Sequence, residues 1–120
     1  MSAPVAADPD VTGFLASIAG LAPLSRQAYA RDLADLDRWR RAQDIADWAG
    51  LDGARLRGWV AARHRAGIGG RSLQRQLSAV RRFYRWLIRE GRAGVNPAVG
   101  LRAPKSPRRP PPPPPPRPAH

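Results

Sequence analysis

A chain of 120 residues, 42% of them apolar, can bury one small hydrophobic core. Disulfide frameworks and cysteine-based metal sites are excluded because there is no cysteine, and the two histidines cannot form a metal site by themselves. No apolar run reaches the length of a membrane span, and the N-terminus lacks the features of a secretory signal. We therefore expect a cytoplasmic protein that has no membrane contact, cofactor, metal or small-molecule ligand.

Positive charge is concentrated in the second half of the chain. Residues 1–70 carry nine arginines and eight aspartates, for a net charge of +1, whereas residues 71–120 carry twelve basic residues and one glutamate, for +11. A bias in base composition can raise the arginine content of a whole protein, but it would not place the charge in one half. The total of +12 therefore indicates a polyanionic partner.

The first half of the chain predicts two helices after a disordered lead over residues 1–9. Asp10 can cap the first helix, which ends at Gly20 and Pro23 and carries four apolar residues at helical spacing, Val11, Phe14, Leu15 and Ile18. Ser25 can cap the second helix, which runs to about Gln43. We expect this helix to bury Tyr29, Leu33, Leu36 and Trp39, and to expose Gln27, Arg31, Ala34 and Arg38.

The second half predicts two further helices. A third helix, capped by Asp52, breaks at the glycines within residues 67–70 and is expected to bury Leu56, Trp59 and Val60. Ser72 can cap a fourth helix that runs to Glu90, with Gly91 as its C-terminal stop.

The predicted fold class is all-α, because apolar and polar residues nowhere alternate over the length of a strand. We expect a bundle of four helices over residues 10–103, with a turn at Asn96-Pro97 after the last helix. Residues 104–120, with consecutive prolines from 110 to 116, are expected to form an independent polyproline II tail. The predicted core holds Phe14, Ile18, Tyr29, Leu33, Leu36, Trp39, Leu56, Trp59, Val60, Leu77, Val80, Tyr84 and Leu87.

The fourth helix has an arginine face opposite its apolar side. This arginine face consists of Arg75, Ser78, Arg82, Arg85 and Arg89, with Arg71 leading into it. Like charges at this spacing repel by about 0.2–0.5 kcal/mol per pair, and no acidic residue of the helix lies on the arginine face. A DNA duplex would supply the countercharge, and an arginine can grip a phosphate or the O6/N7 edge of guanine. The alternative is an ordinary solvated basic surface.

The second helix offers a weaker companion surface. Gln27 and Arg31 share a face that Asp35 and Asp37 flank, so this face alone would be ordinary solvated surface. Its assignment to DNA depends on its pairing with the arginine face. The candidate DNA-binding residues are therefore Gln27, Arg31, Arg71, Arg75, Ser78, Arg82, Arg85 and Arg89. Trp86 is expected to cover the edge of the core.

Two stretches resemble Xer-type tyrosine recombinases. Residues 25–33, SRQAYARDL, followed by Leu36 and Trp39, resemble the second helix of the N-terminal core-binding domain of that family. Residues 70–91, GRSLQRQLSAVRRFYRWLIREG, followed by residues 96–98, NPA, and 101–105, LRAPK, resemble the end of that domain. The resemblance covers about residues 10–105 and depends on the ordered combination of these elements.

The resemblance implies a SAM-like orthogonal bundle of four helices that clamps one face of a recombination half-site. It implies double-stranded DNA and other recombinase subunits as partners, in DNA integration or in recombination that serves chromosome partition. The second and fourth helices would lie against DNA. The family's catalytic groups, including its tyrosine nucleophile, belong to a second domain that follows this one. We therefore expect residues 104–120 to be a truncated linker and the chain to be catalytically incompetent alone.

Two other interpretations stay open. Arg109 with Pro112 and Pro115 has the spacing of an SH3-type ligand, which would make this a proline-rich interaction protein. The chain could also be a truncated remnant without a function of its own.

Overall fold

Four α-helices account for most of residues 8–103, the part of the chain that the computed structural model describes. They are α1 Pro9–Ser17, α2 Pro23–Ala42, α3 Gly53–Arg65 and α4 Gly70–Arg89, and a short 3₁₀ helix, η1 Trp48–Gly50, lies between α2 and α3. These described residues contain no strand, which confirms the all-α prediction. The expected tail, residues 104–120, and the first seven residues of the expected lead lie outside the described residues.

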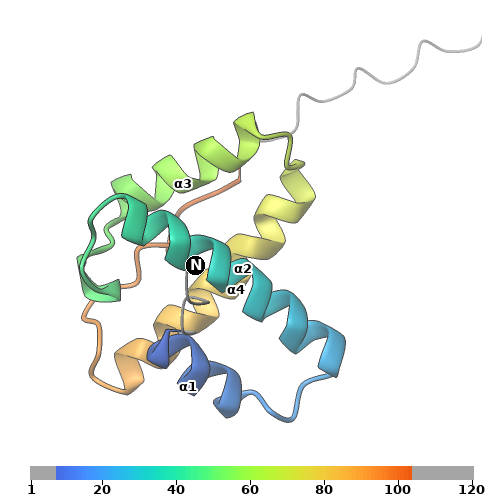
Figure 1. Ribbon diagram of the computed structural model, residues 1–120, viewed down its shortest axis with the longest axis vertical. Coiled ribbons are helices and arrows are strands. Elements are labelled where there is room, and N and C mark those ends of the chain that lie inside the picture. Colours follow the sequence, from blue (N-terminus) through green and yellow to red (C-terminus); the bar gives the residue numbers. More distant parts are fainter. Residues whose placement is uncertain (1–7, 104–120) are drawn as a thin grey trace, which may run out of the picture.

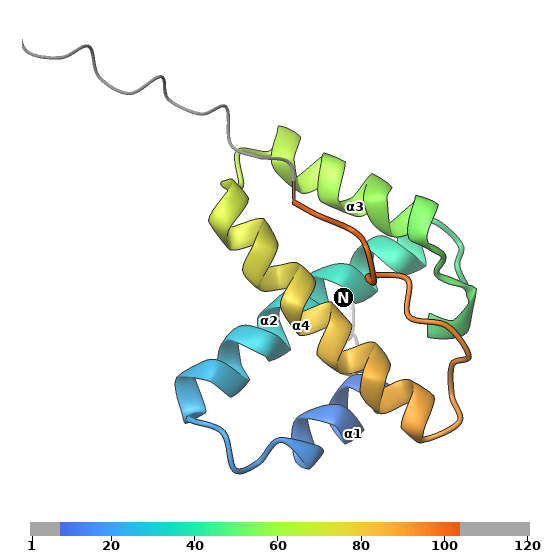
Figure 2. The same ribbon diagram turned by 180° about the vertical axis from the view of Figure 1, so that it is seen from behind.

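Helices α2 and α4 cross at the centre of the bundle (Figure 1). Helix α3 packs along the N-terminal half of α4, and α1 packs against α2 and the C-terminal half of α4, as Figure 2 shows from behind. Helices α1 and α3 therefore lie on opposite sides of the crossing. This arrangement leaves an outward face on both of the crossing helices.

The N-terminal ends of α1 and α2 differ from the prediction. Asp8 rather than Asp10 caps α1, because its Oδ2 accepts hydrogen bonds from the backbone N–H groups of Asp10 and Val11, at 3.0 and 3.2 Å. Residues 8 and 9 therefore belong to the bundle and not to a lead. Helix α2 begins at Pro23 without a side-chain cap, since the fixed φ of proline suits a first helical position. Ser25 thus lies inside its first turn.

At the remaining ends, the cap of α3 and the C-terminal stop of α4 fit the prediction, whereas the start of α4 does not. Asp52 caps α3 by accepting from the backbone N–H of Arg55 at 2.8 Å. Helix α4 begins at Gly70, so Ser72 is not its cap. Gly91 follows α4 with a φ of +71°, a left-handed conformation that glycine adopts without a steric penalty.

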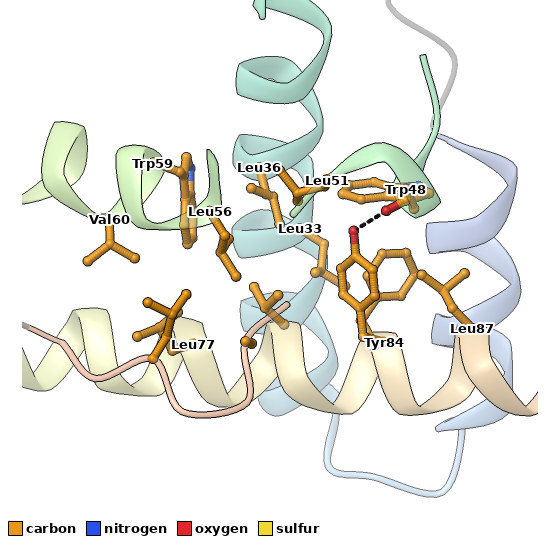
Figure 3. Close-up of a cluster of buried hydrophobic side chains, with 14 of the residues drawn as sticks. Leu33, Leu36, Trp48, Leu51, Leu56, Trp59, Val60, Leu77, Tyr84 and Leu87 are labelled. Atoms are coloured by element: carbon orange, nitrogen blue, oxygen red, sulfur yellow. Dashed lines mark hydrogen bonds between the residues drawn. The ribbon is translucent and has the colours of Figure 1, made fainter. Parts of the chain in front are cut away.

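The core joins all four helices through side chains that are almost completely buried (Figure 3). Ten of the predicted core residues are buried, namely Phe14, Leu33, Leu36, Leu56, Trp59, Val60, Leu77, Val80, Tyr84 and Leu87. The other three, Ile18, Tyr29 and Trp39, are only half-buried, and of these Ile18 and Trp39 pack against the core from its edge. Trp86 is also half-buried and stacks on Phe83, so it covers the core edge as predicted.

The connection between α2 and α3 contributes core residues that the helical periodicity did not predict. Ile45, Trp48 and Leu51 are each at most 3% exposed. The ring of Trp48 meets the ring of Phe83 edge-on, with centroids 4.8 Å apart. Its indole N–H donates to Asp8 Oδ2 at 2.8 Å, so the cap of α1 also fixes this connection.

The segment after α4 returns to the bundle and lies beside α3 and α4 (Figure 2). Arg81 of α4 donates from Nε to the carbonyl oxygen of Ala98 at 3.2 Å and from Nη2 to that of Leu101 at 2.7 Å. The side chains of Ala98 and Leu101 are buried. Across residues 8–103, no helix has the length and apolar character needed to cross a membrane, and no cluster of acidic and histidine side chains could hold a metal ion.

Candidate nucleic-acid interface

The predicted DNA-binding residues all lie on the surface of the two crossing helices. Every one of the eight is exposed: Gln27 and Arg31 on α2, and Arg71, Arg75, Ser78, Arg82, Arg85 and Arg89 on α4. These two helices pack against each other. Two contacts between α2 and α4, one at Arg82 and one at Arg75, tie the arginine face to α2.

Arg82 contacts Tyr29 of α2. Its Nη1 donates to the Tyr29 hydroxyl at 2.9 Å, and its guanidinium carbon lies 5.7 Å from the centroid of the tyrosine ring. Tyr29, which was predicted to be a core residue, is therefore only partly in the core: its ring packs toward Phe14 while its hydroxyl reaches the surface. Tyr29 is a neutral partner, so it orients Arg82 without cancelling its charge.

Arg75 has a partner of the opposite charge. Its Nη1 lies 2.7 Å from Oδ2 of Asp32 on α2, and Asp32 is only 1% exposed. Burial raises the pKa of Asp32 above its ordinary value, and the neighbouring Arg75 opposes this rise. Asp32 was not among the predicted residues, although it lies three residues after Tyr29 and four before Leu36, a spacing that places it on the buried stripe of α2.

The C-terminal half of the arginine face borders a hollow between α1 and α4. This hollow has a volume of about 420 Å³ and is lined by Phe14, Ser17, Ile18, Arg82, Arg85, Ile88 and Arg89. Among residues 8–103, the side chains of Arg85 and Arg89 form neither an ion pair nor a hydrogen bond. The hollow thus combines an apolar lining with unneutralised positive charge. Helical periodicity could not predict this hollow, since its walls come from two helices that are far apart in the sequence.

The two acids that flank the α2 face are neutralised by nearby arginines. Asp35 pairs with Arg38 and lies 3.4 Å from the guanidinium of Arg63 on α3. Asp37 is buried and pairs with Arg40 and Arg41, at 2.5 and 3.0 Å. These pairs reduce the repulsion that the carboxylates of α2 would exert on a polyanion.

Tyr84 is held inside the core, as predicted. Its hydroxyl donates to the backbone carbonyl of Trp48 at 2.5 Å (Figure 3). Burial raises the pKa of Tyr84 far above its ordinary value. A tyrosine that is both buried and hard to deprotonate is a poor nucleophile, which leaves Tyr29 as the one tyrosine whose hydroxyl lies near the arginine face.

The fold and this surface together define a small helical module with a cationic face on two crossing helices. Residues 12–91 match the protein family described as phage integrase, N-terminal SAM-like domain, and the chain belongs to this family. This confirms the family resemblance seen in the sequence.

Similar proteins carry the name tyrosine recombinase XerC. The protein from Xanthomonas campestris pv. campestris (strain B100) is 54% identical over 82 residues, which cover 68% of this chain and 26% of that protein. The one from Xylella fastidiosa (strain 9a5c) is 44% identical over 100 residues, 83% of this chain and 34% of that protein. The chain therefore spans about a quarter to a third of these relatives. No solved structure gives a significant match.

Proposed function

We propose that this chain binds double-stranded DNA as the N-terminal module of a site-specific tyrosine recombinase. The observation that carries the proposal is the unneutralised positive charge of Arg82, Arg85 and Arg89 on the outward side of α4. Side chains held this close together repel one another, and a polyanion removes that repulsion. The names of the similar proteins support recombination as the process that this binding serves.

In this proposal α4 lies against the duplex and α2 lies beside it. An α-helix fits the major groove, and arginines on its outer side reach phosphates on the groove edges. Ser78 is small and exposed, and its hydroxyl donates to the carbonyl of Gln74 on its own helix, at 3.0 Å. A close approach of the duplex at this point therefore displaces no large side chain. Gln27 and Arg31 would extend the contact along α2.

The hollow between α1 and α4 would receive the sugar-phosphate backbone at the edge of the site. Its three arginines suit phosphate oxygens, and Phe14, Ile18 and Ile88 offer apolar surface to the sugars. Other recombinase subunits would be partners through their binding to the same DNA.

We also propose that this chain does not cleave DNA by itself. Phosphoryl transfer to a tyrosine needs cationic stabilisation of the transition state and an acid that protonates the leaving oxygen. Tyr84 is enclosed in the core, and the hydroxyl of Tyr29 has one arginine beside it. Incubation with a nicked duplex should give no covalent protein–DNA product on a denaturing gel. A covalent product that disappears in Tyr29→Phe would overturn this part of the proposal.

The test of DNA binding is a titration of a fluorescently labelled duplex, followed by anisotropy at several salt concentrations. The logarithm of the affinity should fall linearly with the logarithm of the salt concentration, with a slope of about −0.9 for each phosphate contacted. An affinity on the order of micromolar is expected at physiological salt, as for non-specific complexes. A slope near zero, or no binding at low salt, would contradict the proposal.

A further inference from the structure

The arginines of the arginine face differ in how their charge is balanced. Among the described residues, Arg82, Arg85 and Arg89 have no acidic partner, whereas Arg75 forms an ion pair with Asp32 at 2.7 Å. The side chain of Arg75 is 46% exposed and that of Asp32 only 2%. The pair thus presents one half-exposed guanidinium to the surface while its negative charge stays inside the bundle.

This pairing makes Arg75 a poor residue for bulk attraction of DNA. The net charge of the pair is close to zero, so it adds little to the field that draws a polyanion to the surface. Arg75 cannot follow a phosphate away from the bundle either, because the buried Asp32 would then lose its partner, and an unpaired buried charge is strongly unfavourable. The guanidinium is therefore fixed in place relative to α2 and α4.

A fixed guanidinium is suited to reading a base. The bond to Asp32 uses Nη1, and Nε and Nη2 make no hydrogen bond within residues 8–103. Two adjacent N–H donors of an arginine match the O6 and N7 acceptors of guanine, the commonest specific contact in the major groove. Ser78 lies one turn further along the same face, where its small side chain lets the duplex approach closely.

We infer that Arg75, oriented by Asp32, is a specificity-determining residue that reads a guanine base, while Arg82, Arg85 and Arg89 contact phosphates. This inference rests on the proposed function, since it assigns different tasks to residues of the same DNA-binding surface. It gives Asp32 a positioning role: it acts through Arg75 and does not touch DNA.

The test is a binding-site selection on duplexes that contain a randomised stretch of about one helical turn, with the full chain as the bait. Wild-type protein should enrich guanine at one position. Arg75→Lys keeps the positive charge but loses the planar fork, so it should lose this enrichment, by about tenfold or more in relative affinity, while its mean affinity for the random library stays within about twofold. Arg82→Lys is the matched control and should retain the wild-type profile.

The possible outcomes separate this inference from the proposed function. If wild-type protein retains no duplex at all, the proposed function fails and this inference fails with it. If wild-type protein retains duplexes but Arg75→Lys gives the same sequence profile, only the inference is overturned, and the pair of Arg75 with Asp32 is a structural contact. The inference is also overturned if Arg82→Lys loses the same guanine.

A second variant tests the positioning role. Asp32→Asn removes the charge that holds Arg75, so it should weaken the guanine preference and raise the mean affinity for random duplexes, because the surface gains one net positive charge. A purely structural Asp32 would leave the sequence profile unchanged, and that result would overturn its role. If Asp32→Asn does not fold, as judged by circular dichroism, the comparison of Arg75→Lys with Arg82→Lys still decides the assignment of Arg75.

Discussion

Tyr84 of α4 donates its hydroxyl proton to the backbone carbonyl of Trp48, and this hydrogen bond lies wholly inside the core (Figure 3). Tyr84→Phe removes the donor and leaves a buried carbonyl unsatisfied, so it should lower the free energy of unfolding by about 1–3 kcal/mol. Urea denaturation measures this change. Tyr29→Phe is the control and should cost less than about 0.5 kcal/mol, because that hydroxyl lies at the surface. Equal losses would show that the Tyr84 bond adds nothing.

Leu77 is completely buried on α4, where it faces Val60 and Trp59 of α3 (Figure 3). Leu77→Ala should therefore cost about 2–5 kcal/mol in the free energy of unfolding, through lost burial and the cavity left behind. Leu24→Ala removes the same atoms from a side chain that is 79% exposed and should change stability by less than about 0.5 kcal/mol. A loss below about 0.5 kcal/mol at Leu77 would mean that the bundle packs differently.

Replacing two helical glycines with alanine should change the stability of the bundle in opposite directions. A Cβ on Gly13 of α1 would lie 2.8 Å from the ring of Trp86, which is itself stacked on Phe83. Gly13→Ala should therefore destabilise the bundle by about 1–3 kcal/mol through overpacking. A Cβ on Gly58 of α3 would lie 3.5 Å from Trp39, an ordinary contact, so Gly58→Ala should stabilise by about 0.5–1 kcal/mol. Thermal unfolding of both variants measures these two changes in stability. A Gly13→Ala variant more stable than wild type would contradict the packing of α1 on α4.

Stability should depend on pH through Asp32. Burial raises its pKa in the folded protein, so the folded state takes up a proton before the unfolded state does as the pH falls. The contribution of Asp32 to the free energy of unfolding therefore decreases as the pH rises and the carboxyl group loses its proton. Asp32→Asn lacks this contribution, so the wild-type value minus the variant value should decrease as the pH rises above about 4, the ordinary pKa of an aspartate. A difference that rises with pH would show that Arg75 lowers the pKa instead.

Much of the helical bundle could be predicted because periodicity reports which side of a helix is buried. Leu33 and Leu36, and Leu77 and Val80, stand at helical spacing, and each pair is completely buried. Trp48 could not be placed in this way, since it lies in a connection whose single turn of 3₁₀ helix is too short to show a period. Its burial results from contacts with Phe83 and Asp8, which are distant in sequence.

The residues of the candidate site could be predicted from the sequence, but their contacts with residues of the other helix could not. Helical periodicity identified the arginine face of α4, and all of its side chains are exposed. It could not show that Asp32 neutralises Arg75, or that Tyr29 turns its hydroxyl to Arg82, because both contacts join different helices. A buried aspartate at the spacing of an apolar stripe is the one signal that could have indicated the first contact.

We propose that specific arginines of α4, and not the total charge of the chain, bind DNA. The most direct test compares the salt dependence of duplex binding for wild-type protein, Arg82→Ala, Arg85→Ala and Arg57→Ala. Arg57 is an exposed arginine of α3, so its variant has the same net charge as the other two. We expect weaker binding and a slope reduced by about one for Arg82→Ala and for Arg85→Ala, with little change for Arg57→Ala. Equal losses in all three variants would contradict it, since DNA would then be attracted by bulk charge alone.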